Sequence, residues 1–211
     1  MTQREVPTQL PECIEAERVY LRRYRLDDGE LILRVARANR DHLAHYEATN
    51  ALRTITTQDE ADAVVRRFVE AWDKGQAFFL GAFHRSTDAF VAQVYVGPTD
   101  RKLPAYTIGF FADKDHEGMG YVSEAVRAVF RCLFHELGAH RVRLECDDSN
   151  VRSARVAERC GMVREGHLRE NKRNPDGSLT GTLLYGLLRS DYPSADLLES
   201  PRDRRSQRRT L

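Results

Sequence analysis

Gly118-Met119-Gly120 constrains the fold of this chain more than any other short segment, because of what lies on either side of it. The apolar run at 106–112 is typical of a β-strand, and the periodic run at 121–137 is typical of an amphipathic helix. A glycine-rich turn between strand and helix leaves backbone N–H groups free at the helix N-terminus, where the helix dipole favours an anion. Many such turns need glycine only for its positive φ, so the spacing alone leaves both a phosphate site and a plain turn open.

Composition places the chain among ordinary globular proteins. Its 211 residues suit one domain with tails, and it has 41% hydrophobic and 31% charged residues. The net charge of +1 gives no general attraction to membranes and makes a nucleic-acid partner unlikely. No apolar run is long enough for a membrane span or a signal sequence, so we expect a cytoplasmic protein with no membrane partner.

The four cysteines show no spacing that would indicate a metal site. Cys13, Cys132, Cys146 and Cys160 form no C-x-x-C pair, and no histidine cluster accompanies them. Cys132 lies in a helical pattern and Cys146 in a strand pattern, which favours buried free thiols. We therefore expect neither a bound metal nor a disulfide framework.

Strand and helix patterns alternate along the chain. Short runs that alternate or are continuously apolar predict strands at 18–23, 77–83, 90–96, 106–112, 141–146, 163–172 and 179–188. Helical periodicity and capping residues predict helices at 30–39, at 41–48, after the capping box of Thr57 and Glu60, at 121–137 and between Asn150 and Gly161. We expect an N-terminal extension at 1–16, one domain at 17–192 and a basic, disordered tail at 193–211.

This order of elements, with four local motifs, resembles the GNAT superfamily of acetyl-CoA-dependent N-acetyltransferases. The nearest likeness is to the RimJ/RimL-like branch, the ribosomal-protein N-terminal acetyltransferases. The motifs are a central strand at 108–111, a pyrophosphate loop with its helix at 115–125, an N-x-x-S segment at 150–162, and a C-terminal hairpin at 165–170 and 184–189. The resemblance implies an α/β fold with one mixed, mostly antiparallel, seven-stranded sheet, flanked by helices, whose central strands splay apart.

The resemblance also implies acetyl-CoA as cofactor and direct acetyl transfer to a primary amine, either a protein N-terminal α-amine or a small-molecule amine. The implied cofactor-binding residues are Phe110, Phe111, Ala112, His116, Glu117, Gly118, Met119, Gly120, Tyr121, Asn150, Ser153 and Arg155. Asn150 and Ser153 equally suit helix capping, and Arg155 equally suits an exposed helix position. The resemblance leaves a homodimer open.

Two residues are the candidates for catalysis that the resemblance implies. Ser153 would protonate the departing thiolate, and Glu170 would serve as base, with His116 and water as the other candidates for the base. The chain carries Thr107 where many relatives have a glutamate, Ala157 where many have a tyrosine, and Gly181 where an acidic residue is common. These departures keep a second interpretation open, a catalytically silent module that binds acetyl-CoA.

The acceptor site is expected between residues 39–56 and the final hairpin. Plausible lining residues there are His42, His45, Tyr46 and Glu47, each of which equally suits an ordinary helix surface. No motif in the sequence separates a ribosomal protein from a small amine as the acceptor.

Overall fold

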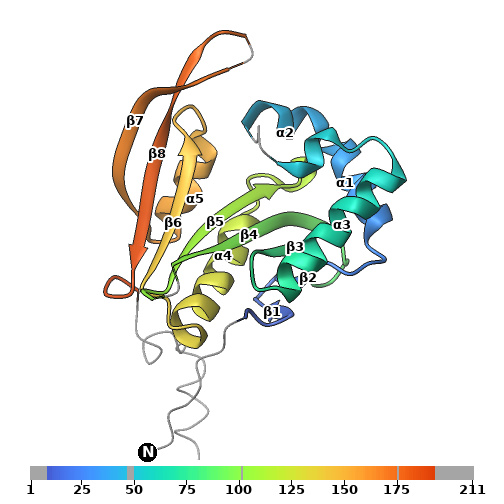
Figure 1. The fold of residues 1–211 in the computed structure, drawn as a ribbon, viewed down its shortest axis with the longest axis horizontal. Helices are drawn as coiled ribbons and strands as arrows, with labels where there is room; N and C mark the ends of the chain where they lie inside the picture. The colour runs from blue at the N-terminus through green and yellow to red at the C-terminus, as the bar shows by residue number, and fades with distance from the viewer. Residues whose placement is uncertain (1–8, 47–49, 101, 175, 193–211) are drawn as a thin grey trace, which may run out of the picture.

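The computed structural model describes residues 9–46, 50–100, 102–174 and 176–192, and the tail predicted at 193–211 lies outside them. Figure 1 shows one open sheet with the strand order β1-β2-β3-β4-β5-β6-β8-β7. The strands are β1 (Cys13–Glu15), β2 (Val19–Arg23), β3 (Phe78–His84), β4 (Phe90–Asp100), β5 (Ala105–Ala112), β6 (Arg141–Asp147), β7 (Val163–Arg173) and β8 (Leu179–Leu188). The helices are α1 (Gly29–Ala38), α2 (Arg40–Tyr46), α3 (Gln58–Asp73), α4 (Tyr121–Arg131) and α5 (Val151–Arg159), with short 3-10 turns at Ala51–Thr54 and Lys114–His116.

The sheet is mixed and mostly antiparallel, as predicted, but the expected seven strands are wrong because the sheet has eight. The additional strand is β1, which pairs antiparallel with β2. Of its three residues only Ile14 is buried. A strand with a single buried residue has no alternation of polar and apolar residues by which the sequence could predict it. The sheet therefore begins before Glu17, where the domain was expected to start.

The two central strands, β5 and β6, diverge after a short stretch of parallel pairing. β5 pairs with β6 only from Ala105 to Thr107, although its other edge pairs with β4 along its whole length. β6 in turn pairs with β8 from Arg141 to Asp147. β5 and β6 therefore open as a V, which is visible in Figure 1, and the predicted splay is confirmed.

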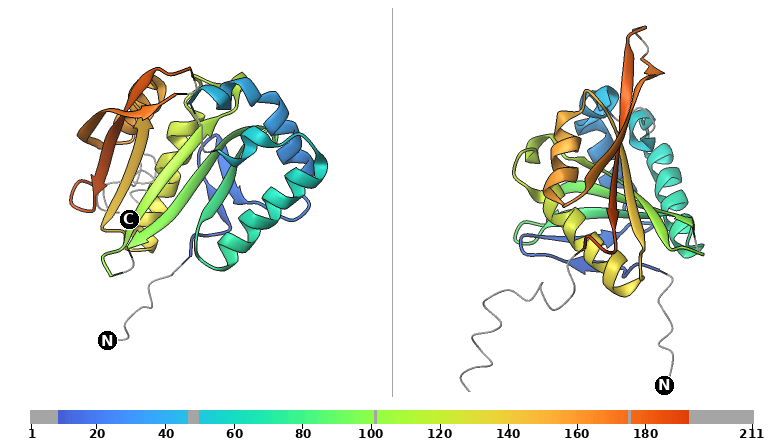
Figure 2. Two further views of the ribbon diagram at one scale, coloured as in Figure 1. Left: turned by 45° about the horizontal axis from the view of Figure 1, so that its top comes forward. Right: turned by 90° about the vertical axis from the view of Figure 1, so that its left-hand side faces the viewer.

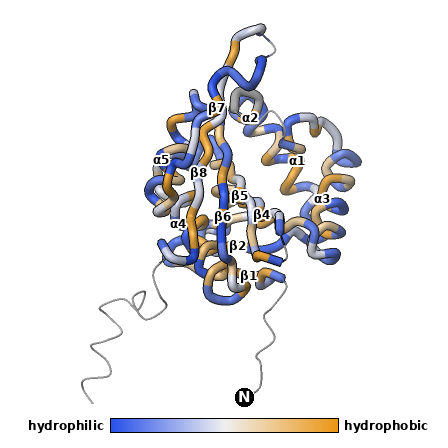
Figure 3. The backbone as a smooth tube through the Cα atoms, turned by 60° about the vertical axis from the view of Figure 1, so that its left-hand side comes forward, coloured by the Kyte–Doolittle hydropathy of each residue, from blue (hydrophilic) through white to orange (hydrophobic). Residues whose placement is uncertain are grey.

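Helices cover both faces of the sheet (Figure 2). On one face α4 and α5 contribute Val126, Phe130 and Ala157 to the larger hydrophobic core. On the other face α1 and α3 pack Ile32 and Phe68 into a second core. The hydropathy colouring in Figure 3 shows α3 with hydrophobic residues among hydrophilic ones, as expected of a half-buried helix.

Local sequence signals fix the ends of the longest helices. The capping box at Thr57 is confirmed, because its side chain accepts from the Glu60 amide while the Glu60 carboxylate accepts from the Thr57 amide. The helix predicted to run to residue 137 is α-helical only to Arg131 and continues as a π-helical turn, Cys132–Glu136. Gly138 then takes a left-handed φ of 62°, as a glycine stop requires.

The outer hairpin β7–β8 carries a wide bulge. The register shifts between Leu168 and Lys172, so that residues 169–171 lie opposite Gly181. A Cβ atom at Gly181 would lie 2.7 Å from the Leu168 carbonyl oxygen, which is too close for any side chain. The close approach of the Leu168 backbone at the bulge therefore requires glycine at position 181.

The four cysteines form no disulfide, and Cys132, Cys146 and Cys160 are buried, as predicted for two of them. Burial raises the pKa of Cys132 to about 12 and that of Cys160 to about 11, so these thiols are protonated at neutral pH. Among the residues that the structure describes, no helix is long and apolar enough to cross a membrane.

Candidate active site

A pocket of about 300 Å³ lies between the C-terminal end of β5 and α5. It brings together the end of β5, the glycine loop, the first turn of α4, one face of α5 and one residue of α2. The lining residues are His42, Phe110, Phe111, Ala112, His116, Glu117, Gly118, Gly120, Tyr121, Val122, Ser123, Asn150, Arg152, Ser153, Arg155, Val156 and Arg159.

The glycine loop presents an uncapped helix N-terminus to this pocket. Gly118 and Gly120 have left-handed φ values of 73° and 82°, which explains the need for glycine at both positions. Gly120 is the N-cap of α4, and no side chain caps the helix there. The N–H groups of the first turn are therefore available to an anion and are reinforced by the helix dipole.

The opposite wall of the pocket is rich in positive charge. Arg152, Arg155 and Arg159 all line it from α5, where the spacings of three and four residues put them on one helix face. The loop contributes one carboxylate, Glu117, which accepts from Arg152 Nη1 at 2.6 Å and lies 3.4 Å from His42 Nε2. Glu117 therefore links α2 to α5 across the pocket.

A buried polar chain orients His116. Asn39 is fully buried at the end of α1, and its Nδ2 donates to Asp113 Oδ1 at 2.8 Å. The other Asp113 oxygen lies 2.9 Å from His116 Nδ1. The Asn39 side-chain oxygen Oδ1 also accepts from the Lys114 amide at 2.8 Å. With Nδ1 engaged by Asp113, His116 has its Nε2 left for a ligand in the pocket.

Asn150 both caps the N-terminus of α5 and lines the pocket. Asn150 is 6% exposed, and its side-chain oxygen accepts from the Ser153 amide at 3.0 Å, which caps the helix. Ser153 takes part in the cap only through its backbone. Ser153 lines the pocket, and among the described residues no side chain hydrogen bonds to its hydroxyl group.

The structure brings together eleven of the twelve residues predicted to bind the cofactor. The exception is Met119, whose side chain is not part of the pocket wall and which is 51% exposed. Glu170 also lies outside this pocket, in a separate open hollow formed by the β7 bulge, where it has a φ of 50°. Ser153 and Glu170 therefore do not share one cavity.

Sequence reasoning missed five lining residues. These are Val122, Ser123, Arg152, Val156 and Arg159. The spacing of Arg152 and Arg159 around Arg155 was the available signal, since one helix face carries all three. Of the expected acceptor residues, His42 lies in this pocket, whereas the side chains of His45 and Tyr46, and all of Glu47, lie outside the described part of the chain.

Comparison with known proteins agrees with this geometry. Residues 18–163 match the family model described as an acetyltransferase (GNAT) domain. The chain is 30% identical over 159 residues to the probable N-acetyltransferase YjcK of Bacillus subtilis (strain 168), covering 75% of this chain and 87% of that protein. The chain therefore belongs to the GNAT acetyltransferase family.

Solved structures show the same fold at low identity. RimL, a ribosomal L7/L12 α-N-protein acetyltransferase in complex with coenzyme A, superposes with a TM-score of 0.76 at 18% identity over 84% of this chain and 98% of that one. Mycobacterium smegmatis RimJ in complex with a coenzyme A disulfide superposes with a TM-score of 0.75 at 20% identity over 90% of each chain. The protein is an acetyl-CoA-dependent acyltransferase, and acetyl-CoA is its cofactor.

The described residues fit this cofactor chemically. The uncapped α4 N-terminus and the arginine face of α5 suit the phosphate groups of acetyl-CoA, and Phe110 and Val156 give the pocket an apolar part. Acetyl-CoA supplies an activated acetyl thioester when it is bound.

Gly118 and Gly177 provide a matched test of the phosphate loop. Both have a left-handed φ, and an added Cβ would meet nothing within 4 Å at either position. Gly118→Ala and Gly177→Ala should each cost about 1–2 kcal/mol of stability, because alanine is strained at positive φ. Only Gly118 lines the pocket, so only Gly118→Ala should weaken coenzyme A binding, by about tenfold. Urea titration and calorimetry measure the two effects, and equal coenzyme A affinities in the two variants would contradict the assignment.

Proposed function

We propose that this protein transfers the acetyl group of acetyl-CoA directly to a primary amine, and that its preferred acceptor is the α-amine of a protein N-terminus. The supporting observation is the single pocket in which the uncapped loop, the free edge of β5 and the Ser153 hydroxyl group meet. An anion anchor and a proton donor that face the same cavity are what transfer from a phosphate-bearing thioester requires.

Ser153 is the proposed general acid. During transfer a C–N bond forms at the acetyl carbon and the C–S bond breaks, so a proton must reach the leaving sulfur. Ser153 lines the pocket, and its hydroxyl group is not engaged by any other described side chain. Its amide is fixed by Asn150, which holds the residue at the start of α5.

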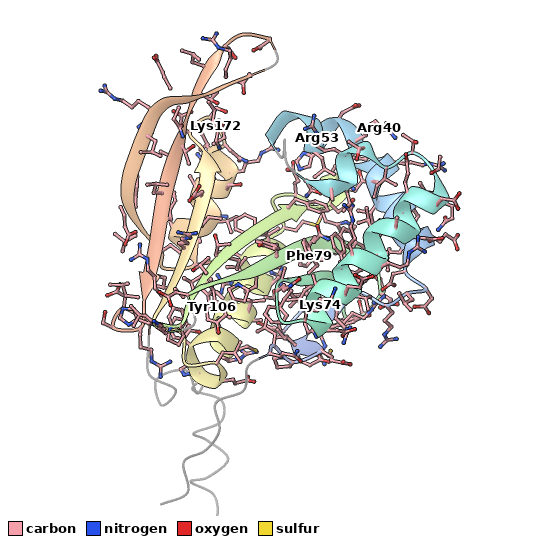
Figure 4. All side chains as sticks on the ribbon, in the orientation of Figure 1. Arg40, Arg53, Lys74, Phe79, Tyr106 and Lys172 are labelled. Atoms are coloured by element: carbon pink, nitrogen blue, oxygen red, sulfur yellow. The ribbon has the colours of Figure 1, made fainter. Side chains whose placement is uncertain are left out.

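The acceptor is proposed to enter between the β7–β8 hairpin and the helices that precede α3. In Figure 4, Lys172 lies on the hairpin side of this opening, and Arg40 and Arg53 lie on the helical side. Thr107 lies on β5 and offers no carboxylate that could serve as a base there. An α-amine has a pKa near 8, against about 10.4 for lysine, so it needs less help from a base at neutral pH. RimL, named as an α-N-protein acetyltransferase, is consistent with this acceptor class.

Glu170 is proposed to attract the cationic amine and to take its proton, directly or through one water molecule. It lies at the β7 bulge with a left-handed φ, on the hairpin that we place beside the acceptor. Its hollow also contains His167, whose Nε2 is 2.8 Å from Asp148 Oδ2. An extended N-terminal peptide could contact this hollow while its α-amine enters the pocket, and proton transfer to Glu170 requires the amine itself to come within one water molecule of the carboxylate.

An amine panel tests the proposed reaction. Coenzyme A release would be followed with N-terminal peptides, the same peptides after Nα-blocking, polyamines and aminoglycosides. We expect free α-amines to give the highest kcat/KM and blocked peptides to give no reaction. Preferred turnover of a polyamine or an aminoglycoside would overturn the acceptor class. Tight acetyl-CoA binding without turnover of any amine would instead favour the catalytically silent module.

Ser153→Ala separates acid catalysis from helix capping. The cap uses the Ser153 amide, so the melting temperature should not change. Loss of the proton donor should lower kcat by about 10²-fold, with little change in coenzyme A affinity. Ser149→Ala is the matched control, because Ser149 lies in the preceding loop and is not part of the pocket. Normal kcat in folded Ser153→Ala would remove Ser153 from the mechanism.

Glu170→Gln keeps the side-chain size and removes the charge. We expect a large fall in rate at neutral pH and partial recovery at higher pH, where the amine loses its proton unaided. Glu165→Gln is the control on the same strand, because Glu165 pairs with Arg141 and lines neither hollow. A pH–rate profile for Glu170→Gln that matches the parent profile would show that Glu170 has no role in proton transfer.

A further inference from the structure

Arg18 holds the glycine loop from the side of β2. This residue comes immediately before Val19, the first residue of β2, and is about a hundred positions from the loop. Its Nη1 donates to the Met119 carbonyl oxygen at 3.1 Å. Its guanidinium carbon lies 4.9 Å from the centre of the Tyr121 ring. One side chain therefore contacts the residues on both sides of Gly120.

Glu124 fixes Arg18 in this position. One carboxylate oxygen accepts from Arg18 Nε at 2.8 Å, and the other accepts from the backbone amides of Arg18 and Val19 at 2.6 and 3.2 Å. The Glu124 side chain is 11% exposed. Burial alone would raise the pKa of Glu124, but the hydrogen bonds from Arg18 and Val19 outweigh burial and lower it. The carboxylate is therefore charged at neutral pH and ties the first turn of α4 to β2.

The contact with Met119 determines where the next amide points. In a trans peptide unit the C=O and N–H groups point in opposite directions. Because the Met119 carbonyl group points to Arg18, the N–H group of Gly120 points away from Arg18. Gly120 itself lines the pocket, and a Cβ atom there would lie 3.4 Å from Arg18 Nη2. Arg18 thus occupies the side of the loop opposite to its free amide.

We infer that Arg18, held by Glu124, is a positioning residue that aims the amides of the glycine loop at the diphosphate group of acetyl-CoA. The inference rests on the proposed use of this pocket for the cofactor. Arg18 does not line the pocket, so its effect passes through the residues that it contacts, the Met119–Gly120 backbone and the Tyr121 ring. Such a residue should matter only for donors that carry the diphosphate.

The test compares Arg18→Gln with Arg131→Gln. Arg131 also joins α4 to the N-terminal strands, through a 2.8 Å bond to the Glu15 carbonyl oxygen, but it lies at the far end of the helix from the loop. Coenzyme A affinity would be measured by calorimetry, and kcat/KM would be measured with acetyl-CoA and with S-acetylpantetheine, which lacks the diphosphate. Arg18→Gln should lose about tenfold in coenzyme A affinity and in kcat/KM for acetyl-CoA, and should keep its kcat/KM for S-acetylpantetheine. Arg131→Gln should leave the preference between the two donors unchanged.

The outcomes separate this inference from the pocket assignment. Unchanged coenzyme A affinity in folded Arg18→Gln, or an equal loss with both donors, would overturn the role of Arg18. A parent protein with no preference for acetyl-CoA over S-acetylpantetheine would instead overturn the phosphate loop itself. If Arg18→Gln does not fold, Glu124→Gln and Arg18→Lys give the same test. Each removes part of the contact, so each should show a smaller loss confined to acetyl-CoA.

Discussion

The divergence of β5 from β6 is the structural constraint on which the rest of the site depends. Parallel pairing ends at Thr107 and Arg143, so beyond that point the facing edges of both strands carry backbone groups without a partner strand among the described residues. Buried backbone donors and acceptors require partners, and a pocket beside such an edge is suited to a ligand that supplies them. The same divergence leaves room for the start of α5, which places Asn150 and Ser153 opposite the end of β5.

Hydrogen bonds and ion pairs between polar side chains then connect the helices to the segments around the pocket. Asn39 and Asp113 connect the end of α1 to the segment after β5, and both residues are buried. Loss of either partner would leave the other as a buried polar group without this hydrogen bond. Glu117 connects α2 and α5 through His42 and Arg152. Every one of these links ends on the few residues around the glycine loop. Loop geometry is therefore set by long-range contacts as well as by the left-handed φ values of its glycines.

The elements with a clear period were predictable, and the features that depend on side-chain partners far along the chain were not. The helix after Thr57 and the strands around 106–112 carry caps and apolar spacing that the structure confirms. The strand at Cys13–Glu15 has one buried residue and hence no period. The contact of Arg18 with Met119 joins residues 101 positions apart, which no local pattern reports. Glu170 lies in the bulge opposite Gly181, outside the pocket. A bulge inserts residues into a strand without a distinctive sequence pattern, so its position could not be predicted from the sequence.

The placement of the candidate proton-transfer groups bears on how the amine must arrive. Ser153 lines the pocket between β5 and α5, whereas Glu170 lies at the outer hairpin, in a different hollow. The base takes its proton from the same nitrogen atom that attacks the thioester, so Glu170 can act only on an amine that reaches its carboxylate directly or through one water molecule. An extended peptide could lie along the hairpin, in contact with the hollow around Glu170, while its α-amine enters the pocket. A low acceptor pKa further reduces the demand on a base. Strand geometry and amine chemistry thus favour the same class of acceptor.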